Sequence, residues 1–409
     1  MTRSSGAESL ASPRLWLAFV MMLVGSGLGS TFPVFFPALL AEFGGSRAAT
    51  ASTVSLMWLV AAALGPLAGY LVDRWSPRLL VVTGLGATAL GLAGAMSAPT
   101  LPLFVLALGV GAGVGVGLTG MVTQAAVIAE TYVRRRGFAT GIAFSGAMGG
   151  YVLSTPAQSA IEAIGWRATL GGYLLIVLIL IPLAVALYPS RLSARAAARV
   201  GSGPAPATPG DPLSTRALVR TPAFWALGFM FTMAPLVGSL ATLQHALYFA
   251  SLGFPAREAA VMLTIGGVLS TSGRALIGLA ADRFGAPLMG VLSLAMSLVG
   301  TLCLVGLEAW PGRVLAYAYV LLVFWPLGTR AVVVSLLVRR LAPPERFGAV
   351  FGVLVMVNSA GAGLGPLLSG AIYDFTGSYV TIYLTATVLL ALSLAALVWF
   401  LSTTRRPSA

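Results

Sequence analysis

Long apolar segments separated by short charged loops dominate this chain and restrict it to a membrane protein with many spans. A membrane-spanning helix needs about 20 largely apolar residues. The sequence holds twelve such segments, at residues 14–38, 48–72, 78–97, 101–128, 137–160, 168–189, 222–250, 257–281, 286–306, 313–338, 347–372 and 378–402. Charged residues make up 9% of the chain, whereas soluble domains carry about 25%. We therefore predict an all-α membrane protein with twelve transmembrane helices.

The distribution of arginine over the predicted loops indicates how the chain crosses the membrane. All 24 basic residues are arginine; 18 lie at the termini and in loops that follow even-numbered spans, 4 lie in the other loops and 2 lie within spans. Because cytoplasmic loops carry an excess of basic residues, we predict that both termini are cytoplasmic. We expect the bacterial cytoplasmic (inner) membrane as the location.

An internal repeat divides the chain into two halves. The segment GYLVDR at 69–74 matches GLAADR at 278–283, an offset of 209. The glycines at 137 and 141 match those at 348 and 352 with an offset of 211, and Pro156 matches Pro366 with an offset of 210. We predict six-helix halves at 1–189 and 221–409, joined by a cytoplasmic linker at 190–220. An even number of spans makes the repeats parallel, a plan in which transporters bind substrate between the halves near mid-membrane.

Two arginines, Arg274 and Arg330, lie inside predicted spans, where a charge costs about 2.5–3.5 kcal/mol on insertion scales. No acidic residue lies within the ten positions that precede either one. Helix rise places each roughly 12–13 Å from the cytoplasmic end of its span, so they share a depth. A guanidinium binds a carboxylate through two hydrogen bonds. We expect Arg274 to anchor an anion and Arg330 to help neutralise or gate it. In the alternative, backbone carbonyls and water molecules bind both guanidinium groups.

Other polar and aromatic residues within spans are further candidates for substrate contacts. Gln124 and Asn358 could donate hydrogen bonds, although such groups also bond between helices. His245, the single histidine, is also the candidate for proton coupling, because imidazole titrates near physiological pH. Phe35 and Trp325 could line the apolar part of a short acyl chain, or pack as ordinary aromatics.

Composition argues against other classes of protein. One histidine and one cysteine, Cys303, do not suffice for a zinc or haem site, and we expect no metal or cofactor. The chain has no GK[ST] phosphate loop for ATP and no plausible nucleophile–base set, so we do not expect an enzyme. The arginines form no basic stripe that would bind nucleic acid. The expected partners are a small carboxylate, a coupled proton and the lipid bilayer, with the chain as a monomer.

The loop after the second predicted span resembles the G-x-L-x-D-R-x-G-x-R motif of the major facilitator superfamily. Gly69, Asp73, Arg74 and Arg78 match, and Ser76 replaces the later glycine. The second copy keeps the residues Gly278, Asp282 and Arg283. The resemblance implies that these seven matching residues form a conformational latch on the cytoplasmic face, in which Asp and Arg pair as charge-assisted partners.

Within that superfamily the chain resembles bacterial monocarboxylate and oxalate–formate type carriers. The segments that carry this resemblance are VFFPALLAEFGGSRAA at 34–49, RRRGFATGIAFSGAMGG at 134–150, GWRA at 165–168 and QHALYFASLGF at 244–254. The resemblance implies that Arg274 binds the substrate carboxylate. Animal-type members carry an acid where this chain has Ser270 and a lysine in the first helix, which reads GSGLGSTFPVFF here.

The resemblance leads us to expect a secondary active transporter of small organic anions that works by alternating access. Monocarboxylates such as lactate or pyruvate are the expected substrates, with proton symport as one coupling mode. The alternatives are an organic anion antiporter of the oxalate/formate or dicarboxylate kind and a drug exporter of the same fold. A drug exporter for cations predicts an acid at mid-membrane depth, and we find none in the predicted spans.

Overall fold

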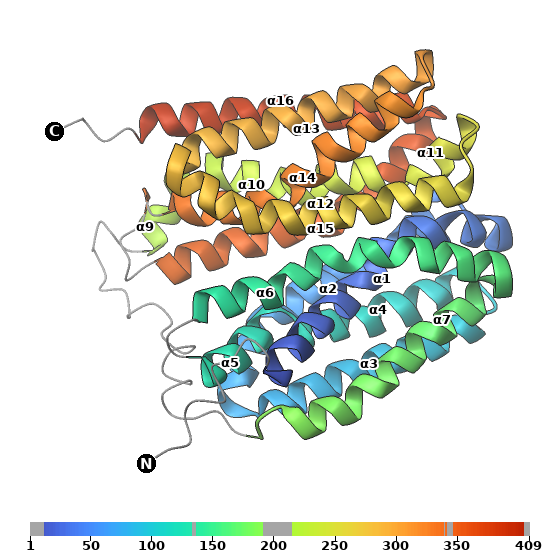
Figure 1. Ribbon diagram of the computed structural model, residues 1–409, viewed down its shortest axis with the longest axis horizontal. Helices are drawn as coiled ribbons and strands as arrows, with labels where there is room; N and C mark the ends of the chain where they lie inside the picture. The colour runs from blue at the N-terminus through green and yellow to red at the C-terminus, as the bar shows by residue number, and fades with distance from the viewer. Residues whose placement is uncertain (1–11, 133–135, 191–214, 339, 342–346, 405–409) are drawn as a thin grey trace. The chain divides into compact units, whose positions relative to one another are not determined.

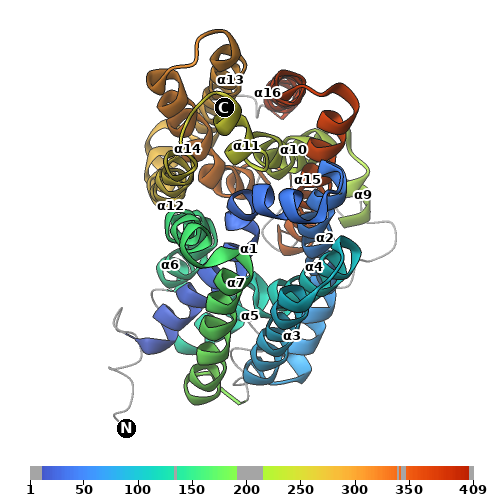
Figure 2. The ribbon, with the colours of Figure 1, turned by 90° about the vertical axis from the view of Figure 1, so that its right-hand side faces the viewer.

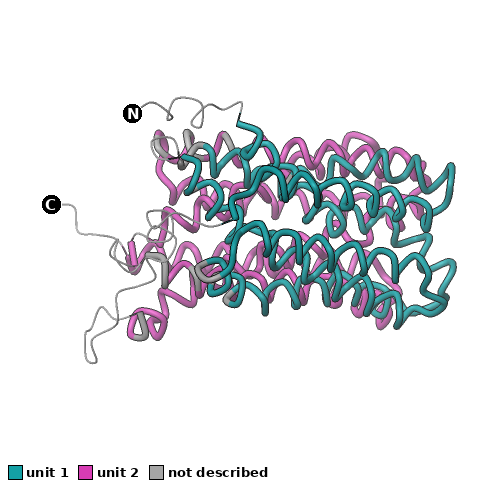
Figure 3. The backbone as a smooth tube through the Cα atoms, turned by 90° about the horizontal axis from the view of Figure 1, so that it is seen from below, with its two compact units in different colours: residues 1–202 teal, residues 203–409 magenta. Residues whose placement is uncertain are grey.

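The computed structural model describes residues 12–132, 136–190, 215–338, 340–341 and 347–404. The chain forms two compact units, residues 1–202 and 203–409 (Figure 3). The division between them falls inside the predicted linker 190–220. Residues 191–214 of that linker lie outside the described part, and its described end holds the short helix α9 (Thr215–Val219).

Unit 1 is built of helices that lie side by side (Figures 1 and 2). They are α1 (Pro13–Phe43), α2 (Arg47–Arg74), α3 (Pro77–Ser97), α4 (Leu101–Thr119), α5 (Met121–Thr131), α6 (Arg136–Gly149), the 3-10 turn η1 (Gly150–Leu153) and α7 (Ser154–Leu187). Figure 1 shows the chain reversing direction within α7. Gly165, with φ of 79° inside this helix, makes the reversal, since a left-handed φ favours glycine.

Unit 2 repeats this plan with its own helices. They are α10 (Pro222–Thr242), α11 (His245–Ser251), α12 (Ala256–Phe284), α13 (Ala286–Ala309), α14 (Arg313–Val338), α15 (Phe347–Thr376) and α16 (Tyr379–Thr403). In unit 1, α4 packs against α2 and α3, and α1 packs against α6 and α7. In unit 2, α14 packs against α12 and α13, and α10 packs against α15 and α16. The shared pattern of neighbours agrees with the repeat read from the sequence.

The prediction of an all-α, multi-pass membrane fold is confirmed for the part of the chain that the structure describes. That part contains helices and no strands. Ten of its helical segments are long and apolar enough to cross a membrane. One of them, at 150–187, includes the reversal at Gly165 and so covers parts of two predicted spans.

Two predicted spans are interrupted rather than continuous. The span predicted at 101–128 breaks at Gly120, which separates α4 from α5. The span predicted at 222–250 breaks at residues 243–244, between α10 and α11. A break leaves backbone groups without partners inside their own helix, and in a bilayer those groups need other partners.

The glycine-rich sequence of α4 is a packing surface for two neighbouring helices. A Cβ on Gly109, Gly113 or Gly117 would lie within 3.0 Å of side chains of α2. A Cβ on Gly111 would lie 2.5 Å from the Cα of Gly91 in α3. Glycine therefore lets both helices approach α4 closely, as small residues do in membrane helix packing.

Candidate functional site

The contact between α12 and α14 is so close that backbone meets backbone. A Cβ on Gly328 would lie 2.0 Å from the carbonyl oxygen of Ser270, and one on Gly273 would lie 2.4 Å from that of Trp325. Pro326 lies inside α14 at the same level. Proline removes one backbone donor and bends a helix, so this part of α14 exposes carbonyl groups to its neighbours.

Side chains of α12, and one of α14 itself, bind these α14 carbonyls. Ser270 Oγ donates to the carbonyl of Phe324 at 2.6 Å, and Thr329 Oγ1 donates to that of Pro326 at 2.7 Å. Arg274 Nε donates to the carbonyl of Gly328 at 3.3 Å. Arg274 is partly buried, and this contact fixes one edge of its guanidinium. The terminal nitrogens, which carry the fork that grips a carboxylate, lie at the other end of the group.

Arg330 approaches different neighbours. Its side chain is 4% exposed. Its Nη2 donates to Ser297 Oγ of α13, and its Nη1 donates to the carbonyl of Ala234 in α10 at 3.5 Å. Arg274 therefore contacts α14 two residues before Arg330, so the two arginines lie at a similar level, but they bind different partners.

His245 lies at the start of α11 and is fully buried. Its Nε2 is 3.0 Å from the carbonyl of Ala259, and its Nδ1 is 3.3 Å from Tyr319 Oη. The Tyr319 hydroxyl is also 3.2 Å from the carbonyl of Ala241. Tyr319 and Gly328 are nine residues apart on α14, about 13 Å along the helix. A short monocarboxylate held by Arg274 is therefore out of reach of His245.

Gln124 and Asn358 both bind backbone groups that a helix irregularity leaves open. Gln124 is fully buried below the break at Gly120, and its Nε2 donates to the carbonyl of Thr119 at 2.8 Å. Tyr188 Oη donates to Gln124 Oε1 at 2.6 Å. Asn358 Nδ2 donates to the carbonyl of Phe231 at 2.6 Å, four residues before Pro235, so proline removes the N–H that would otherwise bind it.

The two aromatic candidates differ in burial. Phe35 is 3% exposed and lies edge-on to Tyr173 of α7, with ring centroids 6.2 Å apart. It therefore belongs to the core of unit 1. Trp325 is partly buried on α14, next to the α12 contact. The backbone carbonyl of Trp325 faces Gly273, the residue before Arg274.

Most of the predicted latch lies outside the described side chains. The side chains of Asp73, Arg74 and Asp282 are not described, and neither are the surroundings of the latch glycines at 69 and 278. Arg283 is exposed, with its guanidinium 5.5 Å from the ring centroid of Phe284. Arg78 caps α7, because its Nη2 donates to the carbonyl of Tyr188 at 2.8 Å. The latch itself stays a prediction.

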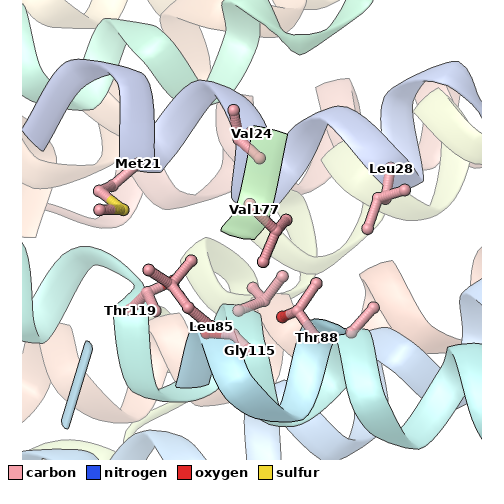
Figure 4. A pocket seen from close by; sticks show the side chains of 11 residues that line it. Met21, Val24, Leu28, Leu85, Thr88, Gly115, Thr119 and Val177 are labelled. Carbon is pink, nitrogen blue, oxygen red and sulfur yellow. Dashed lines mark hydrogen bonds between the residues drawn. The ribbon is translucent and has the colours of Figure 1, made fainter. Parts of the chain in front are cut away.

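Unit 1 encloses a small cavity between α1, α3, α4 and α7 (Figure 4). The centre of a water molecule can occupy about 10 Å³ of this cavity. The cavity therefore has room for about one water molecule. The lining is apolar apart from Thr88 and Thr119. Both hydroxyls already donate to carbonyls one turn earlier in their helices. This cavity is too small for an organic anion.

Tyr319 and Tyr188, the partners of His245 and Gln124, were not predicted from the sequence. A tyrosine inside an apolar span is a weak signal, because Tyr also packs as an aromatic. The contacts of Arg167 in GWRA were also not predicted from the sequence. Arg167 pairs with Glu42 of α1 and donates to the carbonyls of Met96 and Ala98 at the end of α3. It thereby ties three helix ends of unit 1 together.

Comparison with known proteins gives one family. The model of the Major Facilitator Superfamily matches residues 15–337 and 246–409. Monocarboxylate transporter 11 of Homo sapiens is 28% identical over 388 residues, which cover 90% of this chain and 78% of that protein. The oxalate:formate antiporter of Oxalobacter formigenes is 25% identical over 305 residues, covering 71% of this chain and 69% of that protein.

A solved structure shares the fold. The crystal structure of a bacterial homolog to the human lysosomal transporter Spinster, inward-facing and occupied, aligns with a TM-score of 0.72 and 15% identity. The alignment covers 97% of this chain and 98% of that one. At this identity the likeness shows the fold alone.

Proposed function

The chain belongs to the major facilitator superfamily of membrane transporters, and we propose that it is a secondary active carrier of small organic anions. Monocarboxylates such as lactate or pyruvate are the proposed substrates. The carrier is proposed to work by alternating access in a bacterial cytoplasmic membrane, with both termini on the cytoplasmic side. The excess of arginine in one set of loops supports this orientation.

The observation that carries the proposal is the position of Arg274 on α12. The carbonyl of Gly328 holds its Nε at 3.3 Å, so the guanidinium has a defined orientation. A carboxylate binds such a planar group through two parallel hydrogen bonds. The anion would also offset part of the cost of holding a cation at membrane depth. Relatives named monocarboxylate transporter and oxalate:formate antiporter agree with an anionic substrate.

Coupling to a proton is proposed to use His245. The carbonyl of Ala259 can only accept a hydrogen bond, so Nε2 of His245 carries a proton. Tyr319 has one hydroxyl proton, which can go to Nδ1 of a neutral imidazole or to the carbonyl of Ala241. In the second case Nδ1 can itself donate, as it does in the imidazolium. Rotation of the Tyr319 hydroxyl thus lets it bind His245 as either the neutral imidazole or the imidazolium.

Anion exchange is the second candidate, because one relative is named as an antiporter. An exchanger needs no proton site, and its turnover requires an anion on both sides of the membrane. Counterflow experiments therefore distinguish exchange from proton symport.

The test is uptake of labelled L-lactate into proteoliposomes by the wild type and by Arg274→Gln, with and without an inward proton gradient. Arg340→Gln, at an exposed position, is the matched control for loss of one arginine. We expect Arg274→Gln to abolish uptake and Arg340→Gln to retain it. Full lactate uptake by Arg274→Gln would refute the proposed anion site. If Arg274-dependent uptake ignores the proton gradient but responds to internal anion, exchange replaces symport.

A further inference from the structure

Arg330 is a permanently charged side chain enclosed within unit 2. It is 4% exposed, and its Nε has no hydrogen-bond partner. Its terminal nitrogens donate to two neutral groups, Ser297 Oγ and the carbonyl of Ala234. The ion pairs found in the described part of the chain, Glu42–Arg167 and Glu258–Arg313, do not include it. Its positive charge is therefore solvated by neutral groups.

The side chain of Arg330 points away from α12. Gly328 faces α12, because a Cβ there would meet the Ser270 carbonyl at 2.0 Å. Arg330 is two residues further on, which is a rotation of about 200° around the helix. Its contacts with α10 and α13 agree with this direction. An anion held by Arg274 on the α12 side is consequently not a direct ligand of Arg330.

Arg330 nevertheless lies close enough to Arg274 to act through its electric field. Arg274 binds the carbonyl of Gly328, two residues before Arg330. One arginine side chain and this short piece of helix together give a separation on the order of 10 Å. At an effective dielectric constant of about 20, a unit charge at this distance changes the affinity for a monoanion on the order of tenfold. For a dianion the energy doubles, and the change is on the order of a hundredfold.

We propose that Arg330 is a positioning residue that raises anion affinity at the Arg274 site through space, more strongly for each added negative charge. It gives a physical form to the neutralising role that the sequence suggested for Arg330, without a direct contact to the anion. The inference rests on the proposed function, because it needs an anion bound at Arg274. It makes Arg330 a determinant of selectivity between monoanions and dianions.

The test removes the charge without removing the arginine. Ser297→Asp would place a carboxylate against Nη2 of Arg330 and neutralise it, whereas Ser297→Asn has the same shape and no charge. Affinity for L-lactate and for oxalate is measured by calorimetry on the purified full chain in detergent. We expect Ser297→Asp to weaken lactate binding about tenfold and oxalate binding about a hundredfold. Ser297→Asn should leave both within about twofold of the wild type.

Substitution of Arg330 itself provides a second test. Arg330→Lys keeps the charge but loses the fork that reaches α10 and α13, so the field hypothesis predicts near wild-type affinity. Arg330→Gln should match Ser297→Asp. Equal losses for lactate and oxalate, or equal effects of Ser297→Asp and Ser297→Asn, would overturn the inference and indicate a packing role. Binding that needs Arg274 but ignores all these variants overturns the inference alone, and absence of anion binding to the wild type overturns the proposed function with it.

Discussion

Replacement of Gln124 by alanine distinguishes a substrate contact from a structural hydrogen bond. Gln124 is fully buried and bridges the carbonyl of Thr119 and the hydroxyl of Tyr188 at 2.8 and 2.6 Å. Hydrogen bonds between membrane helices average about 0.6 kcal/mol each, so two give a lower bound near 1 kcal/mol. Two buried groups left unpaired cost about 1–3 kcal/mol each, which sets the upper range at a few kcal/mol. We expect Gln124→Ala to lower the free energy of unfolding by that amount.

The assay is unfolding in mixed micelles by increasing the SDS fraction, combined with uptake kinetics in proteoliposomes. Tyr188→Phe and the double variant complete a cycle, and the bond between the two side chains should appear as a coupling energy of about 0.5–2 kcal/mol. At a temperature where both proteins are folded, the KM for the anion should not change. A variant with wild-type stability and a KM raised tenfold would refute this assignment and restore Gln124 as a substrate contact.

Three further perturbations test the packing and the helix irregularities. Gly115→Ala should destabilise unit 1 by about 1–3 kcal/mol in the SDS titration, because the new Cβ would lie within 2 Å of the hydroxyl oxygen of Thr88 in α3. Gly86→Ala is the control, because a Cβ there has no neighbour within 4 Å. Asn358→Ala should lower stability by about 1 kcal/mol, and most of that loss should vanish in a Pro235→Ala background, where the helix regains its own N–H donor; an unchanged loss in that background contradicts the explanation. Arg167→Gln should lower the free energy of unfolding by about 1 kcal/mol in the same assay. Its ion pair with Glu42 is half-exposed, so most of this loss should come from its hydrogen bonds to the α3 carbonyls. A loss above about 3 kcal/mol would mean that the ion pair is effectively buried.

The general fold was predictable from the sequence because bilayer constraints are simple. A run of about 20 apolar residues must form a helix, since no other open structure satisfies its backbone in lipid. The repeat of GYLVDR as GLAADR indicated two related six-helix halves, and both units show the same pattern of helix neighbours. The breaks at Gly120 and at residues 243–244 escaped prediction, because hydropathy records how apolar a segment is and carries no information on where its hydrogen-bond ladder stops.

The candidate site was predictable only in part, and the reason is geometric. Depth along a helix follows from counting residues, so the shared level of Arg274 and Arg330 could be expected. The direction of a side chain around its helix depends on which neighbour packs there, and the sequence does not state the neighbours. Arg330 contacts α10 and α13, whereas Arg274 contacts α14, although both arginines look alike in the sequence. For the same reason the sequence could not show that His245 contacts Tyr319 rather than Arg274.

The irregular helices also explain why so many polar side chains lie at membrane depth in this chain. Two of these irregularities open a carbonyl that a nearby polar group binds: Gln124 just after the break at Gly120, and Asn358 opposite Pro235. Ser270 likewise binds a backbone carbonyl, that of Phe324 in α14. Polar residues of this kind are accounted for by the backbone, so their presence alone does not argue for a substrate. A charge is different, because one carbonyl does not neutralise it. The carbonyls of Gly328 and Ala234 leave the charges of Arg274 and Arg330 in place, and under the proposed function a bound anion would gain affinity from both. This difference makes the charge-dependent comparison of lactate with oxalate more informative than any scan of the polar residues.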